Sequence, residues 1–243
     1  MLVGLVFFST YIEYNLSIMR VRLQTFSHTS KSLWMRRENA VFLASIGISL
    51  LACVCFFSRL AFATQMVFAL ATLLAWLYVA SFESGMLEWN GLRRFGVFKL
   101  AIIAGVWTTV TLVLPALESG IPLMNMPFAL LVLKRLCFLI AITLPFDARD
   151  EMQDRISGVR TLAVLYGAKA AITLSRFFLI VFIILGILSN TFKHPTSALV
   201  DLLPAAVAAV LIFQTSGKAT SDLYYMALDG TLLIMAFSAF FTF

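Results

Sequence analysis

Long apolar runs, separated by short polar segments, follow one another along the whole chain. Eight such runs are present: Leu2–Ile18, Val41–Phe57, Ala63–Ser81, Val97–Leu117, Met126–Pro145, Ala170–Leu188, Ala198–Phe213 and Tyr225–Phe243. Polar and apolar positions do not alternate within them, as they do in the strands of a membrane barrel, so helices are expected. Each run is about long enough to cross a bilayer core of roughly 30 Å at about 1.5 Å per residue. The pattern predicts an all-α, multi-pass transmembrane helical bundle of about eight helices, forming a single domain over residues 1–243.

Composition supports this prediction. Apolar residues make up 61% of the 243 residues and charged residues only 12%, whereas a soluble chain is nearer half apolar and a quarter charged. Lipid is therefore expected to supply much of the surroundings. The net charge of +6 does not indicate nucleic acid, because the basic residues fall mostly in loops and form no separate stripe with interleaved aromatics.

The loops on the two sides of the predicted bundle differ in charge. One set carries twelve basic residues: Arg20, Arg22, Lys31, Arg36, Arg37, Arg93, Arg94, Arg149, Arg155, Arg160, Lys169 and Lys218. The opposite set carries only Arg59 and Lys193. Because loops rich in Lys and Arg stay in the cytoplasm, the first set is predicted to be cytoplasmic.

An acidic cluster closes the fifth apolar run. Asp147, Asp150 and Asp154 stand at i, i+3 and i+7, which on one helix places them within about 60° of arc. Carboxylates so close repel one another unless a cation lies among them, and Mg²⁺ is commonly held by one or two carboxylates plus phosphate oxygens. Gly158 is expected to end this helix. The alternative interpretation is an ordinary charged loop, but the shared face favours a metal–phosphate site.

At these residues the sequence resembles the UbiA prenyltransferase superfamily. The segment from Asp147 to Gly167 is similar to its second aspartate motif, roughly D-x-x-D-x-x-x-D followed by K/R-x-x-G-x-[KR]-T-L-P-x-x-x-G, with Ala163 replacing the proline. Phe95-Gly-Val-Phe-Lys99 resembles the family's Y-x-x-x-K, with Phe95 replacing tyrosine. The family usually has nine helices, so the resemblance implies a member that lacks the first helix.

The resemblance implies a membrane enzyme that moves a polyprenyl group from its diphosphate to an aromatic or similar lipophilic acceptor, with Mg²⁺ as cofactor and membrane lipid around it. Its implied metal ligands are Asp147, Asp150 and Asp154. Its implied diphosphate-binding residues are Lys99, Arg149 and Arg160. A looser similarity to bacterial membrane proteins, which includes Pro145-Phe-Asp-Ala-Arg-Asp150, implies a divergent member of the superfamily. The expected location is a bacterial inner membrane, with the acidic motif facing the cytoplasm as the loop charges predict.

The first aspartate motif of the family is degenerate in this chain. The family pattern is N-x-x-x-D-x-x-x-D, and Asn15 matches its asparagine. Met19 and Leu23 occupy the two aspartate positions, and neither side chain can bind a hard cation. Half of the expected metal cage is therefore absent, which puts catalytic activity in doubt.

Two other functions remain open on the sequence. The first is a non-catalytic relative that binds a lipid diphosphate or a partner protein, as the degenerate first motif suggests. The second is a small transporter or channel, because charges inside a span usually face the bundle interior or a wet cavity. The residues that motivate it are Lys134, Arg135 and Arg176, although no pair of interrupted spans in matching halves accompanies them.

Overall fold

The computed structural model describes residues 1–25, 34–79, 82–84, 87–89, 96–190, 195–214 and 222–240. Its helices are α1 Leu2–Thr25, α2 Trp34–Phe57, α3 Phe62–Val79, α4 Gly96–Thr108, α5 Leu114–Glu118, α6 Met126–Arg149, α7 Glu151–Ile156, α8 Leu162–Tyr166, α9 Ala168–Asn190, α10 Pro195–Gln214 and α11 Asp222–Phe240. A π-helical segment, η2 Thr109–Val113, joins α4 to α5, and strands β1 Phe82–Ser84 and β2 Leu87–Trp89 pair in antiparallel fashion. The predicted helical fold is confirmed for the described residues, apart from these two short strands. The short helix α8 and the break that separates α7 from α6 were not predicted.

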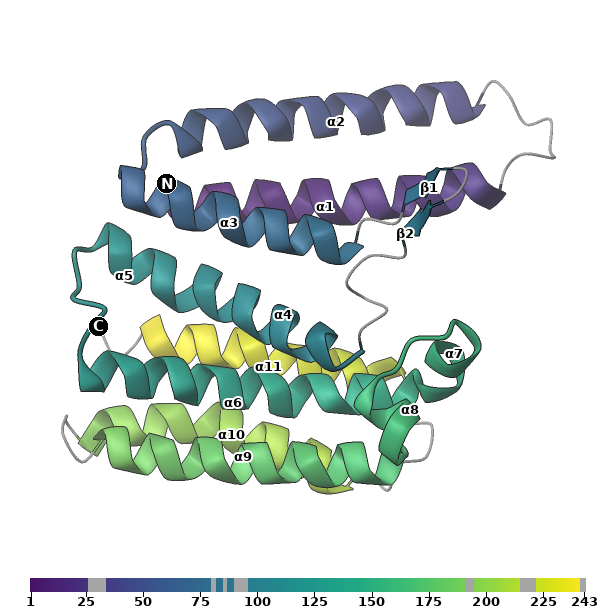
Figure 1. Cartoon of the computed structure of the whole chain (residues 1–243). Helices are drawn as coiled ribbons and strands as arrows, with labels where there is room; N and C mark the ends of the chain where they lie inside the picture. The colour runs from purple at the N-terminus through teal and green to yellow at the C-terminus, as the bar shows by residue number, and fades with distance from the viewer. Residues whose placement is uncertain are drawn as a thin grey trace.

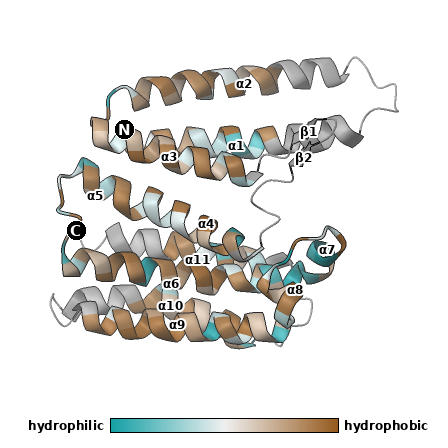
Figure 2. Ribbon diagram, in the orientation of Figure 1, coloured by the Kyte–Doolittle hydropathy of each residue, from teal (hydrophilic) through white to brown (hydrophobic). Residues whose placement is uncertain are grey.

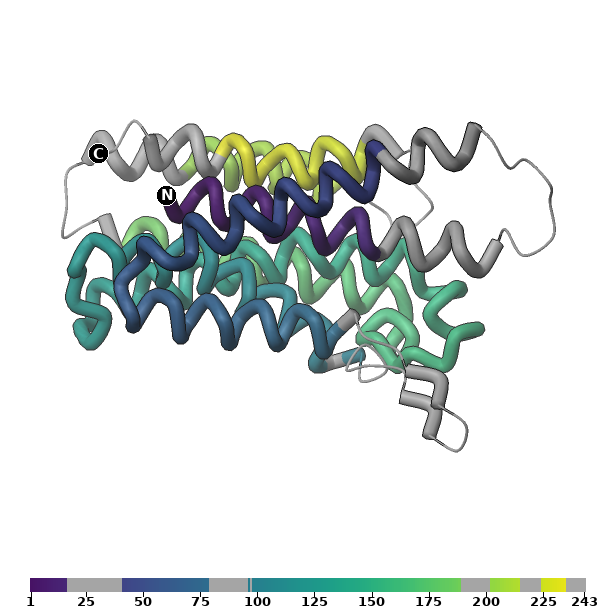
Figure 3. The backbone as a smooth tube through the Cα atoms, turned by 90° about the horizontal axis from the view of Figure 1, so that it is seen from above, coloured from purple at the N-terminus to yellow at the C-terminus, as the bar shows by residue number. Residues whose placement is uncertain are grey.

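The long helices run back and forth along one direction (Figures 1 and 3). In Figure 1, α1, α2 and α3 lie together on one side of the molecule, while α9 and α10 lie on the opposite side. The C-terminal ends of α1, α3 and α6 lie at the same end of the bundle as the N-terminal ends of α2, α4 and α9. This alternation is the one that the predicted division of the loops into two sets requires.

Three helical stretches of the described residues are long and apolar enough to cross a membrane: Phe98–Glu118, Met126–Arg149 and Ala168–Leu188. Shorter apolar helices are Leu2–Leu16, Val41–Phe57, Phe62–Tyr78 and Leu202–Gln214. Hydrophobic residues dominate the long helices in Figure 2, whereas hydrophilic ones are concentrated at α7 and the nearby end of the bundle. Among the described residues, the acidic segment therefore lies at a polar end of largely apolar helices.

The main core lies between α6, α9, α10 and α11. Phe138 of α6 and Phe182 of α9 are almost fully buried, with ring centroids 4.9 Å apart. Leu179, Ile212 and Leu228 complete the same cluster from α9, α10 and α11. Helices α6 and α9 share the most extensive helix pairing in the described structure, and close to the acidic end of α6 the buried Leu144 belongs to a cluster with Ala171 of α9.

A hydrogen bond between helices fixes α6 just before its acidic end. Pro145 lies inside α6 and has no N–H, so the carbonyl of Ala141, four residues earlier, loses its helical donor. The Ser175 hydroxyl of α9 donates to that carbonyl at 2.6 Å in a fully buried position. A bare carbonyl in an apolar interior is costly, so this bond makes a proline tolerable there.

Replacing Ser175 with alanine is expected to lower the free energy of unfolding by about 1–3 kcal/mol, because the Ala141 carbonyl is then buried without a donor. Thr173→Ala on the same helix is the matched control, since the exposed Thr173 hydroxyl only donates to Lys169 within α9. Unfolding titrations of both variants in detergent would measure the difference. Equal stability of the two variants would contradict the role given to Ser175.

Candidate functional site

The acidic segment is built from two helices that meet at Asp150. Helix α6 ends at Arg149, Asp150 follows with φ −87° and ψ 5°, and α7 begins at Glu151. The amide of Asp150 still donates to the carbonyl of Phe146 at 2.9 Å, but its ψ lies outside the helical range and turns the chain. The prediction that Asp147, Asp150 and Asp154 share one face of a single helix is therefore wrong.

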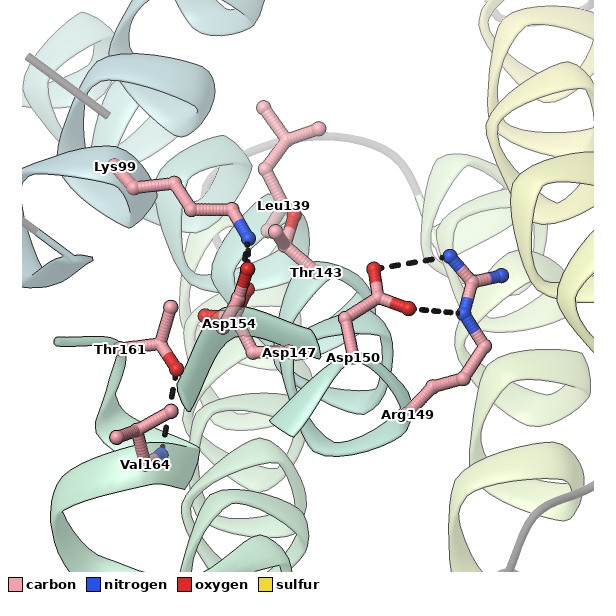
Figure 4. A network of polar contacts seen from close by, with 9 residues as sticks. All are labelled: Lys99, Leu139, Thr143, Asp147, Arg149, Asp150, Asp154, Thr161 and Val164. Atoms are coloured by element: carbon pink, nitrogen blue, oxygen red, sulfur yellow. Dashed lines mark hydrogen bonds and ion pairs between the residues drawn. The ribbon is translucent and has the colours of Figure 1, made fainter. Parts of the chain in front are cut away.

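Two of the three aspartates face the same lysine. The Lys99 ammonium of α4 lies 2.7 Å from Asp147 Oδ1 and 3.6 Å from Asp154 Oδ2 (Figure 4). The exposed fractions are 8% for Lys99, 1% for Asp147 and 3% for Asp154. Three elements, α4, α6 and α7, thus bring a buried ammonium and two buried carboxylates together, and these three residues are called the charged cluster below.

Asp150 points away from the charged cluster (Figure 4). Its carboxylate accepts from Arg149 Nε at 2.7 Å and from Nη2 at 3.1 Å. The same guanidinium lies 4.5 Å from the ring centre of Tyr225 on α11 and 5.3 Å from that of Phe146, both within cation–π range. Arg149 therefore links α6 to α11 in this structure instead of facing Lys99.

The electrostatics of the charged cluster favour an additional cation. Two carboxylates face one ammonium, so with both carboxylates ionised one negative charge among these three groups is uncompensated. Asp147 Oδ2 is buried without a hydrogen-bond partner among the described residues, whereas the buried Asp154 Oδ2 has the 3.6 Å ion pair with Lys99 and no hydrogen bond there. Leu100, Leu144, Ala163 and Ala171 form a buried apolar floor nearby, where charges interact more strongly than in water.

The donor set fits one divalent cation but not the full predicted ligand set. Hard oxygen ligands such as Asp147 and Asp154 suit Mg²⁺, which is commonly held by one or two carboxylates. Within the part of the chain that the structure describes, no group of at least three His, Cys, Asp or Glu side chains is placed to share a metal ion. Asp150 would have to leave Arg149 before it could join the other two.

The chain after α7 is held in a tight turn beside the charged cluster. Gly158 has φ +69°, a conformation that L side chains rarely adopt. Its amide donates to the carbonyl of Arg155 at 3.3 Å, and the amide of Val159 donates to the carbonyl of Asp154 at 2.8 Å. These two bonds define a Schellman cap, so the prediction that Gly158 ends this helix is confirmed.

The helices that follow are also capped locally. The Thr161 hydroxyl accepts from the amide of Val164 at 3.3 Å and caps α8. The Glu151 carboxylate accepts from the amide of Ala168, the first residue of α9, at 3.2 Å. A carboxylate at a helix N-terminus is favourable, and this contact ties α7 to α9.

The remaining predicted residues lie in several places. Arg160 is exposed, while its backbone lies against the first turn of α4. The Asn15 amide donates to the carbonyl of Tyr11 within α1 at 2.7 Å. Met19 and Leu23 lie on α1, but their side chains are outside the described part of the structure.

Of the three basic residues that motivated a transporter, only Lys134 is buried, while Arg135 and Arg176 are partly exposed. Lys134 is buried at 6% exposure, and Arg135 is partly buried. Arg176 Nη2 donates to the carbonyl of Phe213 at 3.3 Å, and its guanidinium lies 5.2 Å from the centre of that ring. Arg176 thus binds the last turn of α10, where a cation is favourable.

Sequence reasoning missed Gly96, which permits the close approach of α4 to the backbone at Arg160. The available signal was a glycine placed one turn before Lys99.

Comparison of the chain with models of known families, with curated proteins and with solved structures finds no match. The residues and geometry of the charged cluster therefore carry the functional argument.

Proposed function

We propose that this chain is a multi-pass membrane protein that binds a prenyl diphosphate at the charged cluster and transfers its prenyl group to a lipophilic acceptor. One observation carries the proposal: Lys99, Asp147 and Asp154 come together, almost fully buried, at the same end of two helices apolar enough to cross a membrane. A buried ammonium beside carboxylates of uncompensated charge is suited to a substrate that arrives with a metal ion and phosphate oxygens.

The exposed surface of α9 supports the membrane part of the proposal. Phe177, Ile180, Ile184 and Ile187 are 46–58% exposed and are spaced as residues on one face of a helix are. A continuous apolar face of this kind rarely remains in contact with water. Lipid acyl chains would cover it in the membrane, and the acidic segment between α6 and α9 would then lie at the cytoplasmic boundary.

Asp147 and Asp154 are the residues that would hold Mg²⁺. When bound, the ion would neutralise charge on the diphosphate as the bond to the prenyl group breaks. Lys99, which pairs with Asp147 in this structure, would donate to a diphosphate oxygen, and the exposed Arg160 on the adjoining segment would supply a second cation. These cations would stabilise the leaving group, and burial of the cluster would limit the access of water to the reacting carbon.

A second candidate function is binding of a lipid diphosphate without transfer. It is favoured by the pairing of Asp150 with Arg149, which leaves two carboxylates in the cluster, and by Met19 and Leu23 in place of acidic residues. A single cation site could anchor a diphosphate and still fail to activate its departure. The two candidates share a ligand and differ only in turnover.

The test uses the purified full chain in nanodiscs with radiolabelled farnesyl diphosphate, Mg²⁺ and a panel of lipophilic aromatic acceptors. Transfer predicts a labelled lipid product that requires Mg²⁺ and disappears in the Asp147→Asn variant. Mg²⁺-dependent binding without product would select the second candidate. Neither binding nor product, with folded protein, would refute both.

A further inference from the structure

Gly96, the first residue of α4, lies directly against the backbone of another segment. A Cβ atom added at Gly96 would lie closer than 3.0 Å to the carbonyl of Arg160 and to the amide nitrogen of Thr161. Such distances essentially never occur for real Cβ atoms, and a backbone cannot rotate away as a flexible side chain can. Glycine is therefore the residue that this contact requires.

The contact closes a ring of interactions around the charged cluster. Lys99 lies on α4 one turn after Gly96, and its ammonium faces Asp154 at 3.6 Å. The carbonyl of Asp154 accepts from the amide of Val159 at 2.8 Å, and Val159 leads directly to the segment that touches Gly96. The side-chain pair and the backbone contact thus join α4 to the α7 region twice, about one helical turn apart.

We propose that Gly96 and the backbone of residues 159–161 form a positioning clasp. This clasp sets the position of the Lys99 ammonium relative to the Asp154 carboxylate. Gly96 touches no reacting group and acts through Lys99. Because a charge-assisted contact weakens as the atoms separate, a shift of the first turn of α4 would expose Lys99 and loosen its pairing with Asp154. The consequence for ligand binding rests on the proposed function, whereas the placement of Lys99 does not.

The chain supplies matched controls for this proposal. Gly105 lies on the same helix, and a Cβ added there meets nothing within 4 Å, so Gly105→Ala changes helix propensity without a clash. Lys134 is as well buried as Lys99, with 6% exposure against 8%, and lies far along α6 from the clasp. Its reactivity reports whether the rest of the bundle stays folded.

The first experiment measures acetylation of individual lysines by mass spectrometry in the purified full chain. In the native protein and in Gly105→Ala, Lys99 and Lys134 should react slowly and at comparable rates. In Gly96→Ala, Lys99 should react several times faster while Lys134 stays protected. A merely structural role for Gly96 would leave the ratio of the two rates unchanged, and that result would overturn the proposal.

A milder variant covers the case in which Gly96→Ala does not fold. Gly158→Ala strains the φ +69° turn that places residues 159–161, and its added Cβ meets nothing within 4 Å. It should also raise the reactivity of Lys99 relative to Lys134. An unchanged ratio in the folded variants would overturn the clasp.

The second experiment measures binding of farnesyl diphosphate in the presence of Mg²⁺. Gly105→Ala should bind like the native chain, and Gly96→Ala about tenfold more weakly, as expected for one weakened charge-assisted contact. If the native chain does not bind this probe, the proposed function fails, while the lysine reactivities still decide the clasp. If Gly96→Ala increases the reactivity of Lys99 but binds farnesyl diphosphate with native affinity, the inferred effect of the clasp on ligand binding is wrong.

Discussion

Replacing Lys99 with methionine is expected to lower the free energy of unfolding by about 3–5 kcal/mol. The ammonium is the cation that faces both Asp147 and Asp154, whose exposed fractions are 1% and 3%. Removing one partner of a buried ion pair leaves the other charge buried without compensation, which costs about this much. Unfolding titrations in detergent with sodium dodecyl sulfate would measure the change.

Two further variants separate this electrostatic effect from loss of packing. Lys169→Met removes an exposed cation at the start of α9 and should change stability by no more than about 0.5 kcal/mol. The double variant Lys99→Met with Asp147→Asn should be more stable than Lys99→Met alone, because it removes one of the two uncompensated carboxylates. If the double variant is the less stable one, the cost lies in lost contacts and not in the buried charge.

Replacing Asp154 with asparagine is expected to weaken Mg²⁺-dependent binding of farnesyl diphosphate at least about tenfold. The variant loses one of the two carboxylates available to a cation, and a contact to a charged group is worth about 1.5–3 kcal/mol, where 1.4 kcal/mol is tenfold. Isothermal titration with and without Mg²⁺ would show whether the loss belongs to the metal-dependent part of the affinity.

Asp150→Asn is the matched variant for this comparison. It removes one negative charge from the same segment as Asp154→Asn does. In the native chain, however, the Asp150 carboxylate binds Arg149 and points away from Lys99. The geometry predicts that its effect on binding is several times smaller than that of Asp154→Asn. An equal or larger loss in Asp150→Asn would show that the ligand moves Asp150 into the charged cluster, as the sequence motif had suggested.

The helices could be predicted from the sequence because hydropathy is a property of each residue and needs no knowledge of neighbours. All eight apolar runs lie on helices wherever the structure describes them. The placement of Asp150 could not be predicted by counting residues along one helix. It depends on a single ψ angle of 5°, which turns the chain between Asp147 and Asp154.

Tertiary partners explain the other differences at the site. Through a resemblance, the sequence pointed to Lys99 and to all three aspartates of the acidic segment. The structure brings Lys99 together with Asp147 and Asp154 but not with Asp150. The resemblance also pointed to Arg149 as a phosphate ligand, but a guanidinium can equally stack on aromatic rings, and Tyr225 lies much later in the chain. No local pattern distinguishes these two roles of Arg149, because Tyr225 is brought beside it only by the tertiary fold.

In the proposed membrane arrangement, the position of the charged cluster near the ends of α4 and α6 would affect how the protein is assembled in a bilayer. Lys99 lies close to the start of one helix and Asp147 close to the end of another, on the side predicted to be cytoplasmic. Neither ionised group then has to traverse the hydrocarbon layer during insertion, which would be costly. Each could stay hydrated until the inserted helices meet sideways, so that desolvation and pairing occur in the same lateral step.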